Sequence, residues 1–176
     1  NTMKTLFSRL FFLTLAVYIF ASCTGDSLIK PIKDGIDVQN YEAAIVAADS
    51  ALLTDPTNAM ALYYRGYALN MKAGATDDIA AREAMYSEMR SNLVDARTAF
   101  ATMEKAPAES EQVTNLILNA WGREHNKAIE YALDDSVMAT VQNPLDYSIQ
   151  HLVNATTVNP DSTLSYDVLA QVYYMN

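Results

Sequence analysis

The sequence has few of the residues on which enzyme active sites and metal centres depend. Its 176 residues include one cysteine, two histidines and one tryptophan. It contains no glycine-rich phosphate loop, no paired cysteines, no HExxH segment and no nucleophile-elbow serine motif. We therefore expect neither a metal centre nor a cofactor, and we predict that the protein is not an enzyme.

The two histidines are better explained as buried structural residues than as acid–base catalysts. His125 follows Glu124, but adjacent residues on a helix point about 100° apart, so these side chains do not form a site together. His151 stands beside Leu152 and has no carboxylate close to it in the sequence.

Glycine and proline are also scarce, at five residues each, and alternating runs of β-branched residues are missing. Strands would require such runs. The protein is 51% hydrophobic, and its apolar residues recur at steps of three and four, which is typical of helices. We therefore predict an all-α protein, long enough for one core or for several stacked repeats.

Basic residues are few compared with acidic ones. The formal charge of the whole chain is −9, and from Cys23 onward 10 basic residues stand against 21 acidic residues, a charge of −11. Affinity for nucleic acid comes mainly from lysine and arginine on phosphates, so no nucleic-acid partner is expected.

Residues 1–22 are predicted to be a signal peptide with two extra residues in front of Met3. Two basic residues near the start precede a predominantly apolar stretch, residues 10–21. These twelve residues are too few to span a bilayer comfortably, and this arrangement is typical of a cleaved secretory signal.

The segment Phe20-Ala21-Ser22-Cys23 resembles the bacterial lipobox, although phenylalanine departs from the aliphatic residue usual at its position. The resemblance implies cleavage before Cys23 and acylation of this residue, which would anchor the protein to a membrane. Thr24, rather than an aspartate, follows the cysteine, and this favours the outer membrane. The alternative is an ordinary signal peptide with an incidental free cysteine.

Residues 23–39 are predicted to form a lipidated tether in front of a helical domain, residues 40–176. The segment is polar and contains Pro31 and Gly35, neither of which suits a helix.

Residues 40–74 contain the clearest helical pattern. The first helix, about residues 40–54, has an apolar face of Tyr41, Ala44, Ile45, Ala48, Ala51 and Leu52. Pro56 ends it, and Asn58 can cap the next helix, about residues 58–72, with Gly74 as its C-cap. Gly66 lies inside this second helix, where it costs about 1 kcal/mol relative to alanine, so we expect a neighbouring helix to approach closely there.

This spacing resembles the tetratricopeptide (TPR) repeat, whose positions are matched by Tyr41, Ala44, Ala51, Pro56, Leu62 and Gly66. A second match covers residues 144–174, through Ser148, Ala155, Pro160, Tyr166, Leu169, Ala170 and Tyr173. The resemblance implies antiparallel helical hairpins stacked as a solenoid. The final residues VLAQVYYMN stop in mid-pattern, which suggests a fragment.

Between these matches the pattern predicts long helices over about 76–105 and 110–134, followed by a helix over 144–158. Arg82 interrupts the apolar face of the first of them. Gly122 stands four residues after Leu118, so we expect it to play the same part as Gly66.

In the TPR family the first helix of each hairpin lines a concave groove. Carried over to this sequence, the groove residues would be Met60, Tyr63, Tyr67 and Asn70 in one helix and Asp167, Gln171 and Tyr174 in the last. Tyrosine offers a large contact area with a polar tip, which suits a partner surface. The alternative is that these tyrosines pack between helices.

The resemblance implies a protein–protein interaction scaffold of the bacterial cell envelope, held at the periplasmic side of a membrane, with a protein or peptide partner. The alternative is an outer-membrane lipoprotein that captures glycans through exposed aromatic side chains, although Trp121, the one tryptophan, is expected to be buried.

Overall fold

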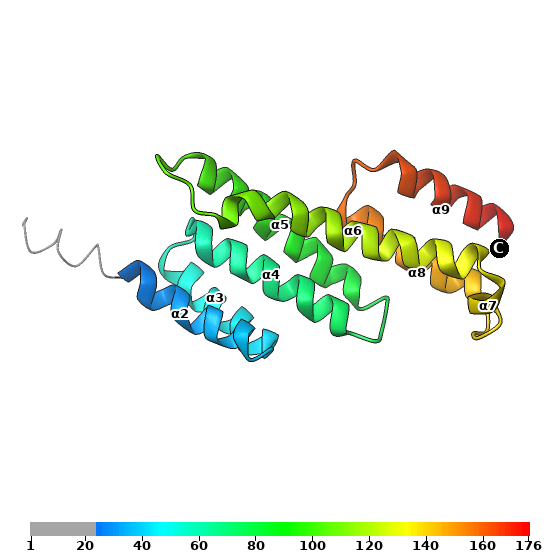
Figure 1. Cartoon of the computed structure of the whole chain (residues 1–176), viewed down its shortest axis with the longest axis horizontal. Coiled ribbons are helices and arrows are strands. Elements are labelled where there is room, and N and C mark those ends of the chain that lie inside the picture. Colours follow the sequence, from blue (N-terminus) through cyan, green and yellow to red (C-terminus); the bar gives the residue numbers. More distant parts are fainter. Residues whose placement is uncertain (1–23) are drawn as a thin grey trace, which may run out of the picture.

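The computed structural model describes residues 24–176, and all regular structure in this range is helical, which confirms the all-α prediction (Figure 1). The signal peptide and Cys23 lie outside the described residues. The helices are α2 (Thr24–Asp37), α3 (Tyr41–Thr54), α4 (Ala59–Ala75), α5 (Arg82–Ala101), α6 (Glu109–Leu133), α7 (Asp135–Met138), α8 (Pro144–Val158) and α9 (Thr163–Met175).

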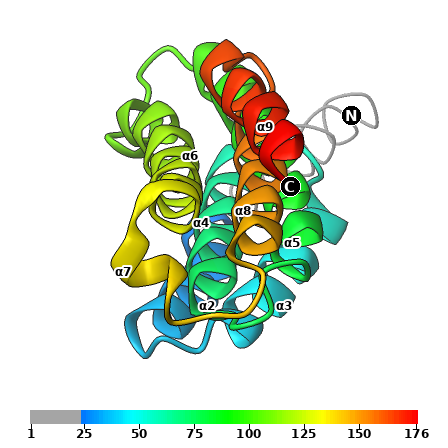
Figure 2. The same cartoon turned by 90° about the vertical axis from the view of Figure 1, so that its right-hand side faces the viewer.

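The helices form a stack of hairpins in which each hairpin contacts the next. Helix α2 pairs with α3, α4 with α5, and α6 with α8, while α7 is a short connector. Between hairpins, α2 and α6 both pack on α4, α5 packs on α8, and α9 packs on α8. The array is elongated in Figure 1, and Figure 2 looks along it from the α9 end and shows α8 between α6 and α5.

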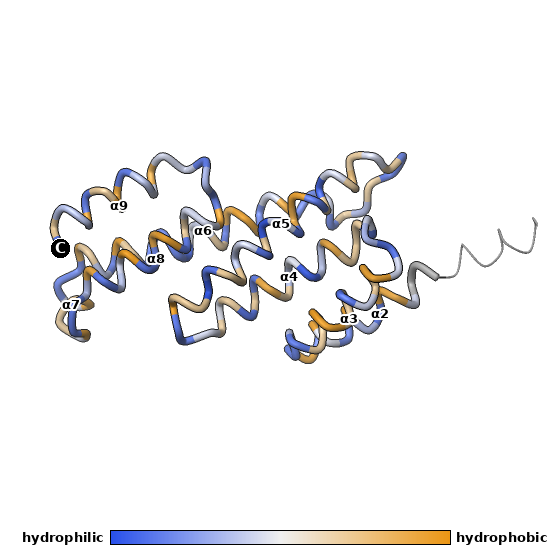
Figure 3. Tube along the Cα trace, turned by 180° about the vertical axis from the view of Figure 1, so that it is seen from behind, coloured by the Kyte–Doolittle hydropathy of each residue, from blue (hydrophilic) through white to orange (hydrophobic). Residues whose placement is uncertain are grey.

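Amphipathic helices hold this stack together. Apolar and hydrophilic positions alternate within each helix along the trace in Figure 3. The larger apolar cluster runs through α2 to α6, and its largest fully buried side chains include Ile32, Tyr86, Met89 and Leu93. A smaller cluster joins α6, α8 and α9 through Ala128, Ala132, Leu152 and Val172.

The predicted N-cap at Asn58 and the close approach at Gly66 are present. Asn58 Oδ1 accepts a hydrogen bond of 3.0 Å from the backbone N–H of Ala61 at the start of α4. A Cβ atom on Gly66 would lie 2.7 Å from Cγ of Leu93, so α5 packs where only a glycine leaves room.

The predicted tether over residues 23–39 is wrong for its described part, because α2 occupies Thr24–Asp37 and packs on α3 and α4. Ile32 is fully buried, and a Cβ on Gly35 would lie 2.9 Å from the backbone nitrogen of Ala44. Gly35 thus permits close contact with α3. Pro31 is exposed, and burial of the apolar face outweighs the local cost of proline in the helix.

Other boundaries also differ from the sequence-based expectation. Helix α5 begins at Arg82 instead of residue 76, because the Asp78 carboxylate accepts hydrogen bonds from the N–H groups of Ala80 and Ala81 and forms a turn. Helix α4 continues through Gly74 to Ala75, and its C-cap is Thr76. Apart from the adjacent backbone of α6 itself, no described atom lies within 4 Å of a Cβ built on Gly122, so this glycine does not allow a close helix contact as Gly66 does.

Candidate functional site

The structure places two of the predicted groove residues inside the contact between α4 and α6. The Tyr63 side chain is 2% exposed, and its hydroxyl donates a 2.9 Å hydrogen bond to Oε1 of Gln112. Asn70 is 4% exposed, and its Oδ1 accepts a 2.8 Å hydrogen bond from Nη2 of Arg123. Burial, together with the negative charge of Glu109, raises the pKa of Tyr63 to about 12. In this arrangement Tyr63 and Asn70 pack between helices and offer little surface to a partner.

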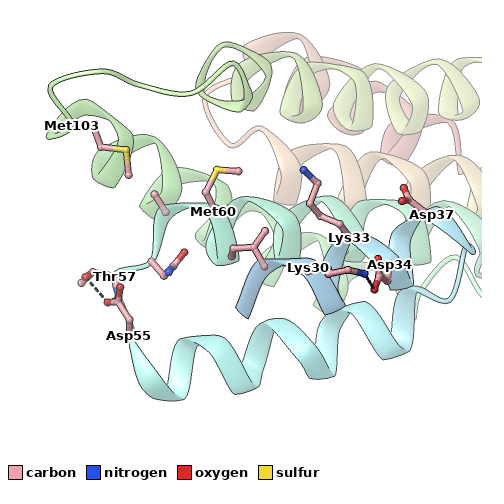
Figure 4. A pocket seen from close by; sticks show the side chains of 11 residues that line it. Lys30, Lys33, Asp34, Asp37, Asp55, Thr57, Met60 and Met103 are labelled. Carbon is pink, nitrogen blue, oxygen red and sulfur yellow. Dashed lines mark hydrogen bonds and ion pairs between the residues drawn. The ribbon is translucent and has the colours of Figure 1, made fainter. Parts of the chain in front are cut away.

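Met60 lies at the edge of an open hollow between α2 and the start of α4, which we call the α2–α4 hollow (Figure 4). Its volume is about 680 Å³, and its lining includes Ile29, Lys30, Lys33, Asp34, Met60 and Met103. In Figure 4 the Met60 side chain lies between those of Met103 and Lys33. The hollow thus combines flexible apolar side chains with charged ones.

Three charged side chains of the α2–α4 hollow, Lys30, Lys33 and Asp34, interact with neighbouring groups. Lys30 Nζ lies 2.6 Å from Oδ2 of Asp34, one helical turn away. Lys33 Nζ lies 5.3 Å from the centre of the Tyr64 ring, a cation–π distance. The Tyr64 hydroxyl in turn donates a 2.7 Å hydrogen bond to Oε1 of Glu109, and burial followed by this bond raises the pKa of Tyr64.

The predicted groove residues of the last helix are all exposed. Asp167 and Gln171 lie on the surface of α9, and Tyr174 is 94% exposed. Tyr67 of α4 is half-buried. Because α9 and the α2–α4 hollow lie at opposite ends of the array, the predicted residues do not form one continuous surface (Figure 1).

A buried charge cluster lies where α5, α6 and α8 meet. Glu124 is fully buried, and its carboxylate accepts hydrogen bonds of 2.6 Å from the Tyr86 hydroxyl and 2.6 Å from Nδ1 of His151. Arg82 Nη1 lies 3.3 Å from the same carboxylate. The cluster reaches α4 through Arg123, whose Nη2 bonds both Tyr86 at 3.0 Å and Asn70.

The pKa values in the cluster follow from these contacts. Burial alone would raise the pKa of Glu124, but the hydrogen bonds from His151 and Tyr86 outweigh it and lower this pKa below its usual range. Burial and the neighbouring carboxylate raise the pKa of Tyr86 to about 12. Among the side chains that the structure describes, every buried nitrogen and oxygen has a hydrogen-bond partner, so the polar groups of the cluster are all engaged within the protein.

Both histidines are buried, as expected from the sequence, at 7% exposure for His125 and 3% for His151. Nδ1 of His125 lies 3.0 Å from Oγ of Ser165, which also accepts a 2.8 Å hydrogen bond from the Trp121 indole. Burial lowers the pKa of His125. The partner of His151 is Glu124, which is 27 residues away in the sequence, and no local pattern indicated this pair.

Trp121 is half-buried instead of fully buried, and its ring stacks on His125 with 5.2 Å between ring centres. Its N–H is used by Ser165 of α9. This side chain therefore joins α6 to α9.

Two further observations concern the described part of the chain. None of its helices combines the length and apolar character needed to cross a bilayer. Among the side chains with a described position, histidine, aspartate and glutamate do not come together in a group of three that could hold a metal ion.

The fold and these surfaces define an all-α protein built from stacked helical hairpins. Comparison with protein-family models, with curated proteins and with solved structures finds no match to this chain.

Proposed function

We propose that the protein is an interaction scaffold of the bacterial cell envelope, built from TPR-like hairpins and anchored by lipid on Cys23. The residue spacing over 40–74 and 144–174 supports the TPR-like assignment. The stacking of each hairpin on the next is in keeping with a solenoid, whose extended surface suits partner binding.

The observation that carries the binding proposal is the α2–α4 hollow. Its volume of about 680 Å³ falls in the range of ligand-sized clefts, and two methionines line it. Methionine is flexible and polarizable, and it is common at surfaces that adapt to different partners. The hollow replaces Tyr63 and Asn70 as the surface that we assign to the partner.

The membrane assignment rests on the sequence pattern before residue 24. A short basic start, an apolar stretch and the lipobox-like ending at Cys23 support an exported lipoprotein. The residue after the cysteine favours an outer-membrane location that faces the periplasm.

The test is affinity capture from detergent-solubilised membranes with the full chain as bait. The variant Met60→Glu/Met103→Glu places two charges in the α2–α4 hollow without removing a hydrogen bond in the described range. Leu53→Glu, at a position that is 88% exposed and does not line the hollow, is the matched control. Circular dichroism verifies that all variants fold.

We expect a specific protein that is captured by the wild type and by Leu53→Glu, and is lost with the double variant. Capture that is equal for all three baits would place the partner elsewhere on the protein. No captured protein with any bait would overturn the scaffold proposal.

A glycan-capturing lipoprotein is the second candidate. The exposed tyrosines of α9, Tyr173 at 58% and Tyr174 at 94%, favour it because aromatic rings stack on sugars. Trp121 gives it less support, since its ring and N–H are both engaged within the protein. A glycan array probed with the same material distinguishes the two candidates.

A further inference from the structure

Arg90 and Arg97 differ from most other basic residues of this acidic protein. In the described range, ion pairs with carboxylates hold Lys30, Arg65, Lys72, Arg82, Arg123 and Lys127. With the described part of the protein, the side chains of Arg90 and Arg97 form no hydrogen bond and no ion pair. Two charged guanidinium groups are thus left unpaired although acidic residues outnumber basic ones by 21 to 12.

The two arginines lie on the same side of α5. They are seven residues apart, which is about two helical turns and about 10.5 Å along the helix axis. Val94 stands between them in the sequence and is half-buried.

Both arginines line one hollow, which we call the Arg90–Arg97 hollow. Its volume is about 160 Å³, and it lies between α5, the first half of α6 and the end of α8. Val94, Ile117, Leu118 and Val158 supply its apolar lining. Leu118 is 46% exposed, so part of this apolar surface is open to solvent.

Polar groups complete the rim of the hollow. Thr114 and Asn159 can donate or accept hydrogen bonds, and Asp161 contributes one negative charge against the two arginines. Arg90 and Val94 also line a neighbouring hollow of about 350 Å³ toward Thr156 and Thr157 of α8, so the accessible surface extends along α5.

We propose that the Arg90–Arg97 hollow binds an acidic amphipathic helix of a partner protein. An aliphatic side chain of that helix fills the hollow, whose volume is close to the roughly 150 Å³ of a cavity that holds one benzene molecule. Two carboxylates about two turns apart on the partner match the spacing of the arginines. Arginine suits this role because its guanidinium binds carboxylates through paired hydrogen bonds.

The net negative charge of the protein favours a short acidic helix over an extended polyanion as the partner. At a formal charge of −9, extended polyanions such as nucleic acids and anionic membrane surfaces are repelled by most of the molecule. A short helix with few carboxylates can place them beside Arg90 and Arg97 and away from most of the negative surface. Its apolar side chain would bury Val94 and Leu118, which stabilises the complex. The inference rests on the proposed scaffold function and names a partner class at a second surface.

The test uses synthetic fourteen-residue helical peptides as probes. Each carries two glutamates seven positions apart and one leucine, isoleucine or phenylalanine midway between them. Control peptides have lysine in place of both glutamates, or serine in place of the apolar residue. Binding to the full chain is measured by fluorescence anisotropy at low and at high salt.

The variant Arg90→Glu/Arg97→Glu reverses both charges, and Lys105→Glu/Lys127→Glu, at two exposed lysines, is a control with the same change in net charge. Neither lysine lines the Arg90–Arg97 hollow. We expect the arginine variant to lose binding by about tenfold or more and the lysine variant to change it by less than about twofold. Binding should also weaken with salt and require both the glutamates and the apolar residue.

The proposal is overturned if no acidic peptide binds, or if both double variants weaken binding equally. It is also overturned if phosphatidylglycerol vesicles bind through the two arginines and the peptides do not. Running the arginine variant in the capture experiment separates the two proposals. Capture that depends on Met60 and Met103 without any effect of the arginines supports the scaffold alone.

Discussion

Glu124 is fully buried, and its carboxylate joins groups from α5 and α8 in one hydrogen-bonded cluster. Replacement by alanine would leave Arg82, Tyr86 and His151 without this acceptor. Removal of one partner of a buried ion pair costs about 3–5 kcal/mol, because the remaining charge stays buried and uncompensated. We expect Glu124→Ala to lower the free energy of unfolding by this amount in urea denaturation.

Glu104→Ala is the control for this prediction. Glu104 is exposed in the loop after α5, and a surface substitution of this kind changes stability by about 0.5 kcal/mol or less. A loss below about 1 kcal/mol for Glu124→Ala would show that the cluster does not stabilise the fold.

One residue in the sequence indicates this cluster. Arg82 interrupts the apolar pattern of the helix predicted over 76–105, and a charged residue in such a position calls for a partner. The partner is Glu124, 42 residues away. His151 gave no such signal, because its carboxylate comes from a different helix and nothing in the local sequence marks the pair.

Helices with a continuous apolar face were predictable as elements. Helix α8 covers Pro144–Val158 as expected, and α3 and α6 lie within one residue of their predicted bounds. Helix α2 was missed because Pro31 and Gly35 oppose a helix locally, whereas tertiary contacts decide its formation. Local preference gave the wrong answer where distant packing determined the structure.

Two glycines within helices give a paired prediction at this scale. A methyl group on Gly66 would clash with the buried Leu93, and overpacking of this kind destabilises a protein by about 1–3 kcal/mol. The higher helix propensity of alanine offsets roughly 1 kcal/mol of this loss. A Cβ on Gly122 would meet no neighbouring helix or side chain, so alanine there adds its higher helix propensity without a clash. We expect Gly66→Ala to lower the thermal midpoint and Gly122→Ala to raise it.

Both variants change the same residue type within a helix, so each serves as the control for the other. If Gly66→Ala proved as stabilising as Gly122→Ala, the close packing of α4 against α5 would not hold in solution. Differential scanning calorimetry of the two proteins is sufficient to decide this.

At the scale of the whole molecule, the order of the helices along the chain was predictable from the sequence. Which helix packs over which face of another was not. The repeat spacing indicated which residues line one side of α4. It could not indicate that α6 would cover Tyr63 and Asn70, because that contact joins residues about fifty positions apart in the sequence. The α2–α4 hollow escaped prediction for a related reason, since α2 was not expected to be a helix.

The proposed membrane anchor also concerns the whole molecule. If Cys23 carries lipid, the expressed protein should sediment with membranes and enter the detergent phase on Triton X-114 partition. Cys23→Ser should move it to the soluble fraction, because acyl chains contribute about 0.8 kcal/mol per buried CH₂. A serine variant that stays with the membranes would contradict lipid anchoring, and a variant that changes only Leu53 serves as the control.

Helix α2 has a consequence for how an anchored protein would be presented. A flexible linker of the length first expected, residues 23–39, would have an average reach of about 23 Å and would let the protein turn freely above the membrane. Instead, the helix begins at Thr24 and is buried in the stack by Ile29, which lies about 7–8 Å along the axis. A lipid on Cys23 would therefore hold the first hairpin, and with it the α2–α4 hollow, close to the bilayer, and the α9 end would lie farther from the membrane surface.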